Sequence, residues 1–120
     1  MKNAIIYVFS GTGNTKKACD IYKNEFEKFG IETTLYNVRK GFENLPNPND
    51  FDLVGFAYPI HGFNAPYIML DLAKALPKAN EKKGYFVVKT SGEPLKINNV
   101  SSIKFNDIMK KKGYVAGSEY

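Results

Sequence analysis

A loop with the composition of a phosphate-binding site occupies residues 9–16 (FSGTGNTK), between an apolar run and a helical pattern. Glycine lets the backbone approach a ligand closely, and the first amides of a following helix point toward that ligand. Side chains that can donate hydrogen bonds alternate here with glycines: Ser10, Gly11, Thr12, Gly13, Asn14 and Thr15. This combination predicts that the start of the helix binds a phosphate group.

Two common phosphate-binding loops do not match these residues. A Walker A loop ends in Gly-Lys-Ser/Thr, and a dinucleotide-binding loop needs a third glycine where this chain has Lys16. The segment from Ser10 to Thr15 does match, at every specified position, the pattern Ser/Thr-x-Thr-Gly-Asn-Thr. In this loop the chain resembles the flavodoxin family, in which the pattern binds the phosphate of flavin mononucleotide (FMN).

The resemblance also assigns two further loops to the flavin ring. In flavodoxin-like proteins these loops follow the third and fourth strands, and the segments here resemble those of flavodoxin-ferredoxin fusion proteins from anaerobes. The residues implied for ring binding are Pro59, Ile60, His61, Gly62, Phe63, Asn64, Thr90, Ser91, Gly92 and Glu93. The implied cofactor is therefore FMN, with no residue assigned to a metal.

Individual residues of the ring loops have distinct expected roles. Phe63 is favoured over Tyr58 to stack on the flavin and exclude water, because Tyr58 still lies within a strand, although Phe63 could instead fill the sheet end. Gly62 has no Cβ and could turn its carbonyl toward or away from a ring nitrogen. His61, the single histidine, could place a pH-dependent charge near the ring or be an exposed loop residue.

Hydrophobic periodicity predicts alternating strands and helices. Short apolar runs predict strands at 4–9, 31–38, 51–58 and 84–90, with a fifth beginning at 114–116. Apolar residues at helical spacing predict helices at 14–29 and 65–76, and another capped by Ser101 or Ser102. Gly30 and Gly113 are placed to end the first and last helices, and Pro59 to end the third strand.

The first helix carries an apolar stripe that should face the sheet, formed by Ala18, Ile21, Tyr22, Phe26 and Phe29. Cys19, the only cysteine, lies beside this stripe and is expected to be buried. One cysteine cannot form an internal disulfide. Residues 39–50 contain glycine and prolines, so at most a turn or two is expected there, around 42–45.

The order of elements predicts a three-layer αβα sandwich with a parallel sheet and right-handed crossovers. The flavodoxin-like strand order 2-1-3-4-5 would bring the three polar loops to one sheet edge. Residues 1–120 would then form one FMN-binding domain that lacks the last helix of a complete flavodoxin-like domain. We expect part of one sheet face to be exposed and apolar, covered by further chain or by a second copy in a homo-oligomer.

Composition narrows the class of protein and its partners. A chain of 120 residues with 43% apolar and 24% charged residues is typical of one globular domain, and no stretch is long enough to span a bilayer. We expect no membrane partner and a cytoplasmic location. The net charge of +5 comes from scattered lysines without a base-reading motif, so no nucleic acid is expected. An acidic redox partner such as a ferredoxin would fit this charge, as would a merely solvated surface.

Three functions are compatible with these patterns. The first is electron transfer between redox partners by an FMN-binding flavodoxin-like protein, which leaves open whether the chain is an enzyme. The second is an FMN-dependent reductase of a quinone or another small acceptor, which turnover with NAD(P)H would reveal. The third is a non-redox interaction domain that has lost the flavin, which the absence of bound FMN would reveal.

Overall fold

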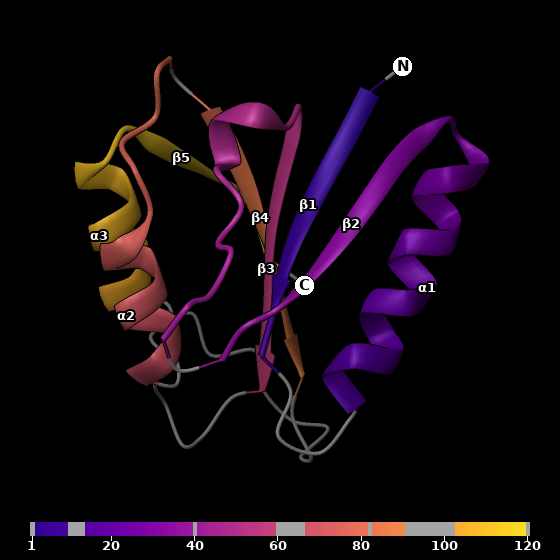
Figure 1. The fold of residues 1–120 in the computed structure, drawn as a ribbon, viewed down its shortest axis with the longest axis horizontal. Helices are drawn as coiled ribbons and strands as arrows, with labels where there is room; N and C mark the ends of the chain where they lie inside the picture. The colour runs from indigo at the N-terminus through magenta and orange to yellow at the C-terminus, as the bar shows by residue number, and fades with distance from the viewer. Residues whose placement is uncertain are drawn as a thin grey trace.

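The described residues form a five-stranded parallel sheet with the order β2-β1-β3-β4-β5, as expected from the sequence and its flavodoxin resemblance. The computed structural model describes residues 2–9, 14–39, 41–59, 67–81, 83–90 and 103–119. Within these ranges α1 lies on one face of the sheet, and α2 and α3 lie on the other (Figure 1). The three-layer αβα arrangement predicted from the alternating elements is therefore confirmed.

The strands are β1 (Lys2–Val8), β2 (Ile31–Asn37), β3 (Leu53–Pro59), β4 (Lys83–Thr90) and β5 (Tyr114–Glu119). From Ala4 to Val8 in β1 and from Val54 to Tyr58 in β3, the central strands are buried on both faces, which is typical of parallel sheets covered by helices. The prediction that the third strand stops at Pro59 is confirmed, although Pro59 is the last residue of the strand rather than the first residue beyond it, because it still pairs with Thr90. Proline lacks only the amide donor and is tolerated where a strand ends.

The helices are α1 (Asn14–Lys28), α2 (Tyr67–Ala75) and α3 (Ile103–Lys111), with a short 3-10 helix, η1 (Pro48–Asp50), that the sequence did not predict. Gly30 and Gly113 follow α1 and α3 with positive φ values of 79° and 92°, as expected for glycines that end helices. The predicted caps of the last helix, Ser101 and Ser102, lie outside the described residues.

The inner face of α1 is narrower than the predicted apolar stripe. Cys19 is buried, and Tyr22 and Phe26 are half-buried against the sheet. Ile21 and Phe29, however, are 64% and 80% exposed, so their assignment to the inner face is wrong. Because α1 packs mostly over β1 and β2, at one side of the sheet, only its central stripe meets other residues.

The larger part of the core lies between the sheet and the α2/α3 layer. Phe56 is fully buried there and contacts several aromatic rings, with a centroid distance of 4.9 Å to Phe105 and a stacked arrangement at 5.3 Å to Tyr7. The Tyr7 hydroxyl donates to the Pro46 carbonyl at 2.6 Å. Burial, with smaller effects of Tyr114, Tyr36 and Asp50, raises the pKa of the Tyr7 phenol above its usual value.

The core on the α1 side is small and has an unusual cover. Its buried residues are Ile6, Val8, Cys19, Ala57 and Val88. The ring of Phe86 lies directly over Gly55 of the neighbouring strand, where a Cβ would collide with it, and packs edge-on against Phe26 at 5.9 Å. The ring of Phe86 thus covers Gly55 on a face where a helix would otherwise have to cover it.

The apolar face that the missing helix would leave exposed stays a prediction. Of the described helices, α1 alone covers this face. Beyond α1 the described apolar side chains include Val115, which is 40% exposed, and the half-buried Phe86. Gly55 and Gly84 also lie on this face and contribute no apolar side chain to it. Coverage by a second copy stays a prediction.

Candidate functional site

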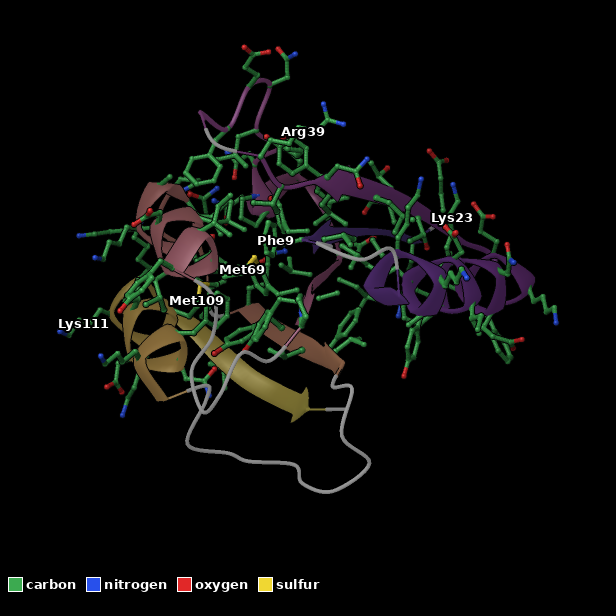
Figure 2. The ribbon with its side chains drawn as sticks, turned by 90° about the horizontal axis from the view of Figure 1, so that it is seen from below. Phe9, Lys23, Arg39, Met69, Met109 and Lys111 are labelled. Carbon is green, nitrogen blue, oxygen red and sulfur yellow. The ribbon has the colours of Figure 1, made fainter. Side chains whose placement is uncertain are left out.

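Three strands end side by side at the carboxyl edge of the sheet, where sequence analysis placed the polar loops. The Phe9 amide donates to the Ala57 carbonyl at 2.9 Å, which holds the end of β1 beside the end of β3. Pro59 pairs with Thr90, which holds β3 beside β4. Figure 1 shows these strand ends at the bottom of the molecule, and Figure 2 views the same edge from below with Phe9 near its centre.

The structure describes only some of the predicted site residues. Pro59 is the half-buried last residue of β3, Thr90 is the last residue of β4, and Asn14 and Thr15 begin α1. The remaining site residues lie outside the described residues: Ser10, Gly11, Thr12, Gly13, Ile60, His61, Gly62, Phe63, Asn64, Ser91, Gly92 and Glu93. Each of these residues belongs to a segment that directly follows a strand ending at this edge.

The start of α1 has the properties of an anion site. The helix begins at Asn14, at the edge where β1 ends, and its first turn contains no acidic residue. Lys16 and Lys17 are both exposed in that turn. Free backbone amides and the helix dipole favour a negative charge at such a terminus by about 0.3–1 kcal/mol for the dipole alone. A phosphate group therefore fits the donors that the described residues present.

Tyr58 is not available to stack on a flavin. Its side chain is fully buried on the α2/α3 side, with its ring 6.0 Å from that of Phe105. The alternative in which Tyr58 stacks on the ring is therefore wrong, and Phe63 stays the prediction. A further residue near this edge that the sequence did not indicate is Tyr67, the first residue of α2, which is 83% exposed (Figure 1). Its only signal in the sequence is an aromatic residue directly after Pro66.

Cys19 is excluded as a participant in thiol chemistry. It is fully buried in α1, and burial, followed by the nearby Asp20, raises the pKa of its thiol to about 11. Reactivity depends on the thiolate, which is then scarce at neutral pH. In the part of the chain that the structure describes, no three metal-ligating side chains lie together.

We expect Cys19 to react with a disulfide reagent at least about a hundredfold more slowly in the folded protein than in guanidinium, near pH 8. In the folded protein the thiolate fraction of Cys19 is lower, and the reagent cannot reach its buried sulfur. The measurement is the rate of thiol release from Ellman's reagent under the two conditions. Similar rates would show that Cys19 is accessible and that the packing of α1 is looser than described.

The fold is similar to those of solved flavodoxins and flavoproteins. A short-chain flavodoxin associated with a bacterial microcompartment matches with a TM-score of 0.75 and 19% identity, over 99% of this chain and 82% of that one. A Fusobacterium nucleatum flavodoxin bound to FMN matches with a TM-score of 0.68 and 17% identity, over 98% of this chain and 70% of that one. A Lactobacillus acidophilus flavoprotein in complex with FMN matches with a TM-score of 0.71 and 16% identity, over 99% of this chain and 92% of that one.

These similarities establish that the chain has a flavodoxin-like α/β fold. No sequence profile of a protein family matches the chain, and no curated protein is significantly similar to it. Across the segments that the structure describes, no helix has both the length and the apolar character needed to cross a membrane.

Proposed function

We propose that this protein binds FMN at the carboxyl edge of its sheet and transfers electrons one at a time between redox partners. The observation that carries the proposal is the start of α1, free of acidic residues, at the edge where β1, β3 and β4 end. Ligands of open parallel sheets bind at this edge, where the strand order reverses between β1 and β3.

Two of the similar structures support FMN as the ligand, because both were determined with FMN bound. The phosphate would be held by the first amides of α1 together with Ser10, Thr12, Asn14 and Thr15. The ring would lie between the segments that follow β3 and β4, at residues 59–64 and 90–93. FMN, when bound, supplies the redox chemistry, and the protein residues bind and orient it and exclude water.

The test is titration of the purified protein with FMN, followed by flavin absorption and fluorescence. We expect saturable binding of about one flavin per chain, with quenched fluorescence because an aromatic residue stacks on the ring. Steady-state turnover with NAD(P)H and a quinone is expected to be negligible. Protein that remains colourless at saturating FMN would overturn the proposal and favour an interaction domain, while rapid turnover would favour a reductase.

The partner is proposed to be a redox protein, and an acidic ferredoxin would fit the net charge of +5. The cytoplasmic location expected from the sequence stays a prediction.

A further inference from the structure

We infer that an acidic redox protein docks on a specific part of the carboxyl edge, formed by Lys16, Lys17, Arg39 and Tyr67. We refer to these four residues as the carboxyl-edge surface. The inference rests on the proposed function, since a partner must approach the edge where the flavin binds. It goes further by naming the residues that meet the partner and the sign of the partner's charge.

The three basic residues border the proposed flavin site. Lys16 and Lys17 are exposed in the first turn of α1, which begins directly after the phosphate loop. Arg39 is exposed and follows Val38, whose amide donates to the Val8 carbonyl at 2.7 Å, so Arg39 lies near the end of β1. Figure 2 shows Arg39 and Phe9 on the edge that faces the viewer.

These positive charges are available to a partner. Among the described residues, the only ion pair joins Lys28 to Glu25, at the opposite end of α1. Asp20 and Glu43 are exposed on the same two segments and offset two of the three positive charges, which leaves these described side chains with a net charge of about +1. An acidic surface would therefore be attracted, and association would be faster at low ionic strength.

Tyr67 adds an apolar contact on the other side of the strand ends. It begins α2 and is 83% exposed, although it belongs to a residue type that proteins prefer to bury at least partly. Exposed tyrosines are frequent hot spots of protein interfaces because they bury a large area with few rotatable bonds. Tyr67 on α2 and the lysines on α1 thus border the site from opposite faces of the sheet.

A second group of lysines provides the matched control. Lys110 and Lys111 are exposed in the last turn of α3, at the opposite edge of the sheet, where β5 is about to begin. Lysines in a last turn stabilise the helix by interacting with its dipole, so their position is explained without a partner. Figure 2 shows Lys111 on the outer side of α3, remote from Phe9.

The test compares the double variants Lys16→Gln/Lys17→Gln and Lys110→Gln/Lys111→Gln, which change the net charge equally. The probe is a strongly acidic plant-type 2Fe–2S ferredoxin, and its dissociation constant is measured by surface plasmon resonance at about 0.03 M and about 0.3 M salt. We expect the first variant to bind about three- to tenfold more weakly at low salt, and the second less than about twofold. Tyr67→Ala should weaken binding with an unchanged salt dependence.

Equal weakening by the two double variants would overturn the inference, because net charge alone would then explain binding. Unchanged binding of Tyr67→Ala would overturn the role of that residue. Because Lys16 and Lys17 also border the proposed phosphate site, FMN is first titrated into each variant, and ferredoxin binding is then measured at an FMN concentration that saturates that variant. These titrations separate this inference from the proposed function. Failure of every variant to bind FMN contradicts the proposed function, whereas normal FMN binding without ferredoxin binding contradicts only the docking surface.

Discussion

FMN is expected to bind this protein at least about a hundredfold more tightly than riboflavin, which lacks the phosphate. The phosphomonoester would accept hydrogen bonds from the first amides of α1 and from the hydroxyls of the preceding loop. Hydrogen bonds to a charged group contribute roughly 1.5–3 kcal/mol each, so two of them already correspond to about a hundredfold or more. Both dissociation constants follow from quenching of flavin fluorescence.

A loop variant provides the control for this comparison. Thr12→Val removes a hydroxyl that we expect to contact the phosphate and preserves the shape of the side chain. It should weaken FMN binding by about tenfold and leave riboflavin binding unchanged. Riboflavin binding as tightly as FMN would show that the loop does not hold the phosphate, and the functional proposal would then lose its main support.

The phosphate loop is predicted from a local signal, the pattern of glycines and hydrogen-bond donors from Ser10 to Thr15. Residues 10–13 lie outside the described residues, so the loop stays a prediction. The parallel sheet was predicted from short apolar runs that alternate with helices, and its strand order was implied by the flavodoxin resemblance; both are confirmed. The ring-binding residues at 60–64 and 91–93 lie outside the described residues, so their assignment stays a prediction.

The orientation of α1 could not be predicted because it depends on distant segments. Ile21 and Phe29 fit an apolar stripe by spacing alone, but the helix lies over β1 and β2 near one side of the sheet. A buried stripe needs a neighbour on each flank, and α1 has no described helix beside it. Ile21 lies about 200° around the helix from Cys19, and Phe29 lies past its last residue.

The sequence around β3 also does not indicate that the core on the α2/α3 side is larger than the core on the α1 side. Residues 51–58 (FDLVGFAY) are uniformly apolar apart from Asp52, as expected for a strand that is covered on both faces. Alternation places Phe56 among the aromatic rings of the α2/α3 layer and Gly55 beneath a single ring, that of Phe86. This contrast predicts that the two faces contribute very differently to stability.

Truncation of Phe56 to alanine is expected to lower the free energy of unfolding by about 3–5 kcal/mol, the range for fully buried phenylalanines. Phe56 is completely buried and its ring contacts those of Tyr7, Tyr85 and Phe105. The surrounding rings cannot collapse into the space because both helices and the sheet hold them. The measurement is urea-induced unfolding followed by circular dichroism, with the midpoint and slope compared between variants.

Phe86→Ala is the matched control, because it removes the same ring from the adjacent strand on the α1 side. Phe86 is only half-buried and contacts mainly Gly55 and Phe26, so we expect roughly half the loss, about 1.5–2.5 kcal/mol. If Phe86→Ala were as costly as Phe56→Ala, the α1 side would be more thoroughly covered than the described residues indicate. A second copy seated on that face would produce this result, and the loss would then increase with protein concentration.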